Sequence, residues 1–277
     1  MKPFHILFAL LLSVTFYAQQ TESPYLKVLT KNAQIPLKET SVDVQISGTI
    51  AHVKILQVYK NDGNTPIEAK YVFPLSTQAA IHKMDLSIGN RTTHAKIFEK
   101  KQAQKVYDKA IKEGKRAVKL DQERPNVFQM NVGNVMPNDE IKIEIYFTEM
   151  LVPVDGEYQF VFSTVVGPRF VGETSKSEKV FNTPYTKKGV NATFDFDLNI
   201  CINAGIMLQS VASTTHKIDI NYPSADSAEV FLSNENKNPS NRDFILNYSL
   251  RGNKIQSGLL LYEGEKENFF TFMMEPP

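Results

Sequence analysis

The sequence of 277 residues contains no tryptophan and only one cysteine, Cys201. Sugar-binding and glycoside-cleaving sandwich proteins commonly stack a sugar ring on tryptophan, so this absence weighs against that class without excluding stacking on tyrosine. A lone cysteine cannot form a disulfide within the chain, and the fold must therefore be stabilised by packing. Cys201 lies in an alternating run, which favours a small inert strand residue over an interchain disulfide or a nucleophile.

An excess of charge of either sign is also absent. The chain has 31 Lys and Arg against 30 Asp and Glu, and removing Lys2 with the N-terminal segment leaves 30 of each (31 − 1 = 30). Proteins that bind nucleic acid or an anionic membrane usually present a strongly basic surface. We therefore expect no nucleic-acid partner.

Long hydrophobic runs are confined to the N-terminus, where residues 6–16 are mostly apolar. This stretch follows Lys2 and precedes Ala18, the expected cleavage residue of a signal peptide that spans residues 1–18. It is about half as long as a bilayer-spanning helix, which makes a retained N-terminal anchor the less favoured alternative. The sequence thus predicts an exported protein, secreted, at the cell surface or periplasmic, with no transmembrane segment after signal removal.

Motifs of catalysis and of metal binding are missing too. The sequence has no Gly-x-Ser-x-Gly run, no glycine-rich phosphate loop and no paired-cysteine zinc motif. The histidines beyond the signal segment are too scattered to have the spacing of metal ligands; they are His52, His82, His94 and His216. We expect no metal and no cofactor.

What the sequence does contain is apolar residues that alternate with polar ones. The clearest run is Ile141, Ile143, Ile145 and Phe147, with lysine, glutamate and tyrosine between them. A period of two indicates strands with one buried face, as in an antiparallel β-sandwich. The fold class is therefore mainly β, and residues 172–189 are expected to form a long exposed loop. Further strands are predicted over 42–46, 67–73, 84–88, 128–132, 158–162, 194–202, 218–222, 230–232, 244–250, 258–262 and 269–273.

One segment, residues 97–114, has helical spacing instead. Its apolar residues recur at intervals of three and four, which predicts one basic amphipathic helix packed against a sheet. Gly114 supplies the expected stop. The apolar positions are Ala103, Val106, Tyr107, Ala110 and Ile111.

Together these blocks resemble the VIT domain, the vault and inter-alpha-trypsin-inhibitor heavy-chain module. The resemblance is strongest between Thr40 and Phe170. It rests on 50–51, 58–61, 68–75, 98–103, Tyr107, Ala110, Gly114, 124–128, 132–137 and 167–170.

The resemblance implies a β-rich module with one packed helix and no catalytic residues of its own. We expect a VIT core over residues 25–170 and a C-terminal β-rich half over 171–277, ending at a domain border. Such modules usually precede a von Willebrand factor A domain, whose adhesion site needs an Asp-x-Ser-x-Ser run to hold a hard cation. That run is absent here, so the metal-dependent binding is not transferred. The chain is expected to be a stand-alone module or the front half of a split or truncated gene.

The predicted function is that of a non-catalytic scaffold or adhesion module whose partner is a protein, with a von Willebrand A-type domain as the partner the resemblance implies. The C-terminal strand 269–273 is the expected docking element because it is strongly apolar and precedes two prolines. Arg124 and Arg169 are suited to hold a partner carboxylate, or to tie a loop to backbone carbonyls or a buried acid. The interaction candidates are Lys105, Lys109, Arg124, Arg169, Phe269, Phe270 and Met273.

Two alternatives stay open. The basic helix, including Lys105 and Lys109, would suit a module that binds acidic glycans or a membrane surface. A secreted sandwich-type hydrolase would use Glu140 and Glu144, but positions i and i+4 of a strand lie about 13 Å apart, too far for a direct acid–base pair.

Overall fold

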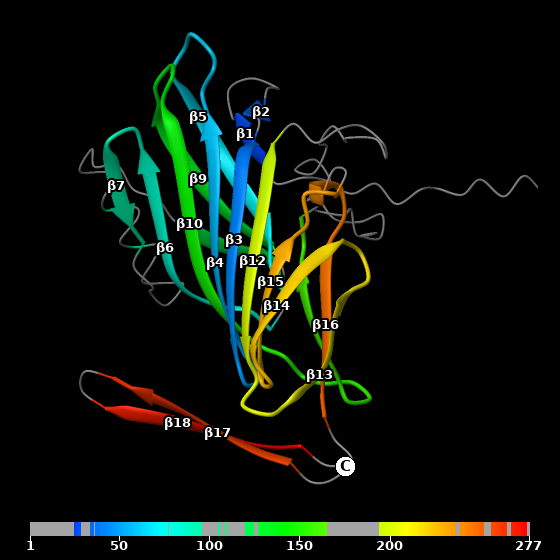
Figure 1. The fold of residues 1–277 in the computed structure, drawn as a ribbon. Coiled ribbons are helices and arrows are strands. Elements are labelled where there is room, and N and C mark those ends of the chain that lie inside the picture. Colours follow the sequence, from blue (N-terminus) through cyan, green and yellow to red (C-terminus); the bar gives the residue numbers. More distant parts are fainter. Residues whose placement is uncertain are drawn as a thin grey trace, which may run out of the picture.

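In the computed structural model, the described residues lie mostly in strands (Figure 1). It describes residues 25–28, 34–35, 37–76, 78–95, 105, 109, 120–124, 127–164, 194–236, 239–251, 256–264 and 267–275. The strands are β1 (Tyr25–Val28), β2 (Gln34–Ile35), β3 (Leu37–Ser47), β4 (Ile50–Lys60), β5 (Ile67–Pro74), β6 (Ala80–Ile88), β7 (Arg91–His94), β8 (Leu120–Arg124), β9 (Val127–Val135), β10 (Glu140–Met150), β11 (Glu157–Phe162), β12 (Asp195–Asn203), β13 (Leu208–Ser213), β14 (Ile218–Ser224), β15 (Ser227–Leu232), β16 (Phe244–Leu250), β17 (Gln256–Glu263) and β18 (Asn268–Glu275). A short 3-10 helix, η2, spans Pro239–Asn241.

The main layer is an eight-stranded sheet in the order β14-β15-β12-β3-β4-β10-β6-β7. Its central strands are eleven residues long and alternate between buried and more exposed positions, so that one face forms the core. The predicted mainly β fold is therefore confirmed. One pairing differs from an antiparallel sandwich, because β12 runs parallel to β3. The chain between β3 and β12 is long enough to return to the end of the sheet at which β3 begins. A parallel pairing requires such a return.

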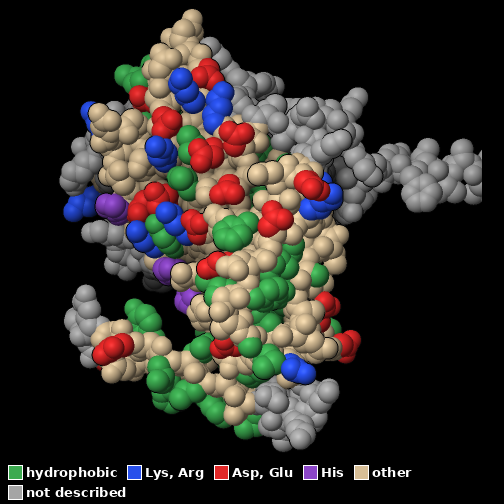
Figure 2. All heavy atoms as spheres, in the orientation of Figure 1, with side chains coloured by type: hydrophobic (Ala, Val, Ile, Leu, Met, Phe, Trp, Pro, Cys, Tyr) green, Lys and Arg blue, Asp and Glu red, His purple; other side chains and the backbone are tan. Residues whose placement is uncertain are grey.

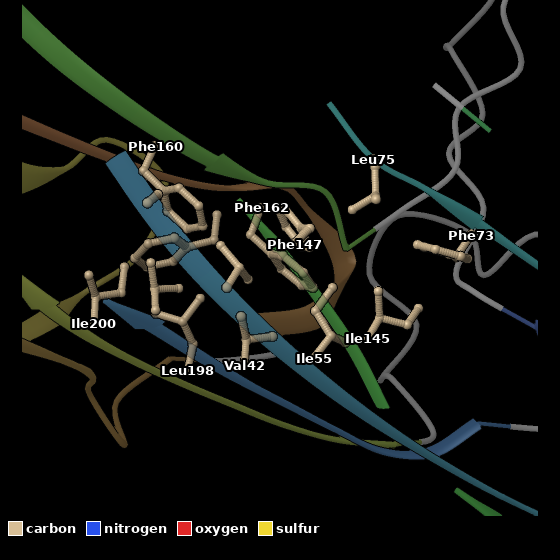
Figure 3. Packing of buried hydrophobic residues seen from close by; sticks show 14 of the residues in the cluster. Val42, Ile55, Phe73, Leu75, Ile145, Phe147, Phe160, Phe162, Leu198 and Ile200 are labelled. Carbon is tan, nitrogen blue, oxygen red and sulfur yellow. The ribbon is translucent and has the colours of Figure 1, made fainter. Parts of the chain in front are cut away.

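Two smaller sheets form the second layer. One has the order β2-β1-β5-β9-β8, and the other has the order β11-β16-β13. Side chains from both smaller sheets meet the large sheet in one hydrophobic cluster. Figure 3 shows Phe160 and Phe162 of β11 beside Val42 and Leu198, with Phe73 farther along the same interior. Because β12 and β16 contribute to this core, the two halves of the sequence share it.

The turn after β4 explains one residue of the family blocks. Asn61 is buried after β4, and its amide nitrogen donates to the carbonyl oxygens of Thr65 (3.1 Å), Val135 (3.3 Å) and Met136 (3.1 Å). Its side-chain oxygen accepts a hydrogen bond from the backbone N–H of Gly63 at 3.1 Å. One side chain thus ties the β4–β5 turn to the end of β9, so this part of the block has a structural role.

The predicted amphipathic helix lies almost entirely outside the described residues. Of residues 97–114 only Lys105 and Lys109 are described, and both are exposed. The packed helix therefore stays a prediction. The expected loop over residues 172–189 also falls outside the described part of the chain.

Candidate interaction site

The last two strands form a hairpin that stands apart from the layered sheets. β17 and β18 pair only with each other among the described strands, with Leu259 opposite Phe272 and Leu261 opposite Phe270. Figure 1 shows this hairpin, in red, projecting from the base of the large sheet. We call it the C-terminal hairpin. The predicted docking strand, residues 269–273, lies within β18.

Both faces of the C-terminal hairpin carry apolar side chains. Because side chains alternate along each strand, the register defines an outer face and an inner face. The outer face consists of Leu259, Leu261, Phe270, Phe272 and Met274. The inner face consists of Gly258, Leu260, Tyr262, Phe269, Thr271 and Met273.

The apolar side chains of the hairpin are unusually exposed. All five outer-face residues, together with Tyr262 and Phe269 of the inner face, are between 56 and 77 % exposed. Figure 2 shows hydrophobic side chains along the hairpin and an open gap between its projecting part and the body. A monomer rarely presents a contiguous apolar patch larger than about 300–600 Å² unless that patch has a function. This hairpin is therefore the strongest candidate site.

The base of the hairpin packs against the body at positions occupied by glycine. Met273 is half-buried and packs against the main core. Leu260 lies over Gly205, where an added Cβ would be 3.2 Å from its Cγ. An added Cβ on Gly258 would lie 2.6 Å from the carbonyl oxygen of Gly205. The hairpin therefore approaches the body so closely that a side chain at these glycines would collide with it.

Among the described side chains of the hairpin, the charged ones lie at its tip. Glu263 ends β17, Glu267 precedes β18, and both side chains are exposed. Neither carboxylate forms an ion pair with another described residue. The site thus combines an apolar surface with an acidic end. An isolated two-stranded hairpin is only marginally stable in water, and burial against another surface would stabilise it.

Three of the predicted interaction residues lie in this hairpin, and the other four lie elsewhere in the sequence. Phe269 and Phe270 are exposed, whereas Met273 faces the body. Lys105 and Lys109 are exposed but lie in a segment that is otherwise not described. For Arg124 only the backbone is described, and Arg169 lies outside the described ranges.

Sequence reasoning predicted both strands of the hairpin, over 258–262 and 269–273, but it assigned only the second to docking and missed their pairing. Leu259, Leu261 and Tyr262 belong to a predicted strand, yet nothing assigned them to the docking element. The available signal was local: two apolar runs of similar length separated by the short polar turn around Gly264, which favours a hairpin.

The carboxylates considered for hydrolysis are engaged on the outer side of the large sheet. Glu140 accepts a hydrogen bond from Lys142 at 2.9 Å, and Glu144 accepts one from the Tyr146 hydroxyl at 2.8 Å. This bond to Glu144 raises the pKa of Tyr146 to about 12. The two glutamates therefore sit in separate pairings rather than around a shared cleft.

The described histidines do not converge. His94 contacts Asp85 at 2.7 Å, and this hydrogen bond lowers the pKa of that carboxyl. His216 is buried, with Nε2 donating to the Pro239 carbonyl oxygen at 2.7 Å. No group of three or more His, Cys, Asp or Glu side chains suited to a metal occurs in the described ranges. Nor does any helix found there have the length and apolar character needed to cross a bilayer.

Comparison with known proteins agrees with the resemblance seen in the sequence. Residues 37–147 match the family model of the vault protein inter-alpha-trypsin domain. Protein mono-ADP-ribosyltransferase PARP4 of Mus musculus is 29 % identical over 246 residues, which are 88 % of this chain and 12 % of that protein. The von Willebrand factor A domain-containing protein 5A of Homo sapiens is 31 % identical over 151 residues, 53 % of this chain and 19 % of that protein. The chain thus spans less than a fifth of the length of these relatives.

Among solved structures, an M1 zinc metallopeptidase from Deinococcus radiodurans aligns over 87 % of this chain and 47 % of its own chain. The identity is 6 % and the TM-score is 0.38. A similarity this low supports no functional argument.

The architecture of the described residues defines the class first: a layered, mainly β protein with an added apolar hairpin. Within that class, residues 37–147 form a VIT domain, as the sequence blocks predicted. Relatives of this chain include proteins that are named for a von Willebrand factor A domain.

Proposed function

We propose that this chain is an exported, non-catalytic interaction module that docks a von Willebrand A-type domain through its C-terminal hairpin. The observation that carries the proposal is the outer face, where Leu259, Leu261, Phe270, Phe272 and Met274 are all more than half exposed. A surface of this kind gains free energy when a partner removes it from water. The choice of partner comes from the names of the relatives.

Export and the absence of catalysis are parts of the proposal supported by different observations. The apolar run over residues 6–16 supports a signal peptide. The separate pairing of Glu140 and Glu144 gives no support to the hydrolase alternative. The exposure of Lys105 and Lys109 is what an ordinary solvated surface also shows, so no specific observation favours the glycan- or membrane-binding alternative.

The proposal is tested by measuring binding of the full mature chain to a panel of purified von Willebrand A domains from the source organism. Phe270→Ser should weaken binding by about 10- to 100-fold, since burying a phenylalanine contributes about 1.5–3 kcal/mol and 1.4 kcal/mol is a factor of ten. Calorimetry or surface plasmon resonance provides the measurement.

The matched control is Phe231→Ser. Phe231 is an exposed phenylalanine of β15, a strand of the large sheet, and its substitution should leave binding unchanged. Equal losses for the two variants, or no binding by any domain of the panel, would contradict the proposed function.

A further inference from the structure

The projecting half of the C-terminal hairpin is apolar on both of its faces. On the outer face Leu261 lies opposite Phe270, and on the inner face Tyr262 lies opposite Phe269. The two inner-face rings have centroids 6.4 Å apart, and both rings remain mostly exposed. A partner that covered only one face would leave the other pair of side chains in water.

The basal half of the hairpin differs from the projecting half. There the inner face is occupied, because Leu260 and Met273 contact the body at Gly205 and Gly48. Only the outer face is left accessible at this end, through Leu259, Phe272 and Met274. A partner can therefore reach both faces of the tip but only one face of the base.

The exposed area matches that of a specific protein interface. Phenylalanine and tyrosine each bury about 150–250 Å² when fully covered. The four exposed rings, Tyr262, Phe269, Phe270 and Phe272, are each more than half accessible, which gives roughly 400–600 Å². The exposed apolar area rises further with Leu259, Leu261 and Met274. The total then approaches the area that each partner buries in a standard interface, about 800 Å².

The charge at the tip discriminates between kinds of partner. Glu263 and Glu267 flank the turn and are exposed. Glu265 and Lys266 lie between them in the sequence, so the tip carries three acidic residues against one basic residue. Carboxylates at the leading end of an inserting loop are costly in a bilayer and are repelled by anionic headgroups. The same carboxylates interact favourably with a protein surface that presents lysine or arginine where the tip contacts it.

We propose that the hairpin tip is inserted into an apolar slot of a folded partner protein, with a wall against each face and cationic side chains at its floor. This inference rests on the proposed function and deepens it by specifying the binding surface of the partner. The slot receives Leu261 and Phe270 on one wall and Tyr262 and Phe269 on the other. The rim of the slot covers the outer face of the base.

The test uses neighbouring residues that point to opposite faces. Leu261→Ser and Tyr262→Ser, each in the full mature chain, are measured against a von Willebrand A domain that binds the unmodified protein. Insertion into a slot predicts that each substitution weakens binding at least tenfold. Tyr222→Ser is the matched control, because Tyr222 is an exposed tyrosine of β14, a strand of the large sheet.

The acidic tip is tested in the same assay with Glu263→Lys combined with Glu267→Lys. Reversing both charges should lower the association rate at least tenfold at low salt and have less effect at high salt, because screening removes the attraction. An unchanged association rate would overturn the cationic floor.

The possible results separate the slot from the proposed function. If only one of Leu261→Ser and Tyr262→Ser weakens binding, the partner lies flat on one face and the slot is wrong, while docking by the hairpin stands. If neither does, the hairpin is not the docking site and both proposals fail. Retention of the chain on phosphatidylcholine–phosphatidylglycerol vesicles, or a sedimenting dimer lost in both variants, would assign the tip to a membrane or to a second copy and overturn the slot.

Discussion

At the scale of single residues, Gln57 is the centre of a buried polar cluster between the large sheet and the second layer. Its side-chain oxygen accepts hydrogen bonds from Tyr71 at 2.5 Å and Tyr59 at 3.2 Å, and its nitrogen donates to Thr40 at 3.4 Å. Burial raises the pKa of both phenols, so they remain protonated donors at neutral pH. These bonds connect β4 of the large sheet with β5 of the second layer.

Gln57→Leu should therefore lower the free energy of unfolding by about 2–4 kcal/mol. The substitution leaves two buried hydroxyls without their acceptor, and each unsatisfied group costs about 1–3 kcal/mol. Urea denaturation measures the change. Gln45→Leu, at an exposed position of β3, is the control and should stay within about 0.5 kcal/mol of the unmodified protein. Similar effects of the two substitutions would rule out the network as a stabilising element.

His216 gives a second prediction at this scale, on the pH dependence of stability. Burial lowers its pKa from 6.5, and the Thr215 hydroxyl lies 2.8 Å from Nδ1. The Pro239 carbonyl can only accept, which makes Nε2 the protonated nitrogen of the neutral ring. The folded state then binds fewer protons than the unfolded state below about pH 6.5, so the free energy of unfolding falls as the pH drops through that value.

The measurement compares urea unfolding at pH 7.5 and pH 5.0. His216→Gln should reduce the loss of stability between these two pH values. His52→Gln, at an exposed position, should not. A His216→Gln protein with the pH dependence of the unmodified chain would show that other groups cause it.

At the scale of elements, the surface of the body that contacts the base of the hairpin, which we call its seat, is formed by glycine backbone at Gly48 and Gly205. Gly48 and Gly205 have φ values of 62° and 71°, which L side chains rarely adopt. Gly258 of β17 faces the Gly205 carbonyl from the other side. The orientation of the hairpin thus depends on three residues that have no side chain.

Gly258→Ala should displace the hairpin without unfolding the body. The new methyl group would collide with the Gly205 carbonyl oxygen, whereas few other contacts hold the hairpin in place. We expect increased amide exchange in residues 256–264 and at least tenfold weaker partner binding, with the melting temperature nearly unchanged. Gly133→Ala is the control, since an added Cβ there meets nothing within 4 Å. Unaltered exchange in the Gly258→Ala hairpin would refute this account of the seat.

Most of these elements could be predicted because the alternation is strong. The run Ile141 to Phe147 became β10, and the turn Pro137–Asp139 contains Asn138 with a φ of 67°. The position of the hairpin could not be predicted in the same way. Its apolar residues have the composition of a core strand, and periodicity alone does not reveal whether a second layer covers them.

At the scale of the whole molecule, the parallel pairing of β12 with β3 joins the two halves of the chain. The register runs from Asp195 beside Glu39 to Asn203 beside Ser47. Because these residues are far apart in the sequence, no local pattern could predict that they are neighbours. The boundary expected at residue 170 therefore remains a statement about sequence motifs, while the sheet itself continues across it.

Two truncations should have opposite outcomes. A chain ending at residue 170 lacks β12 and β16, so β3 becomes an edge and part of the core loses its cover; we expect it to aggregate or unfold. A chain ending at residue 251 lacks only the C-terminal hairpin and should keep a cooperative thermal transition. Circular dichroism and size-exclusion chromatography distinguish these outcomes. A folded, monomeric chain ending at residue 170 would show that the first half is independent.

The pairing of β3 also has a consequence for biosynthesis. Until the ribosome has added residue 203, the eleven-residue strand β3 has a neighbour on the β4 side only. During that interval its backbone groups present an open template to any other nascent strand. We therefore expect the yield of native protein to depend on chaperones that bind the growing chain, and to fall more steeply with expression rate than for a VIT domain whose sheet closes locally.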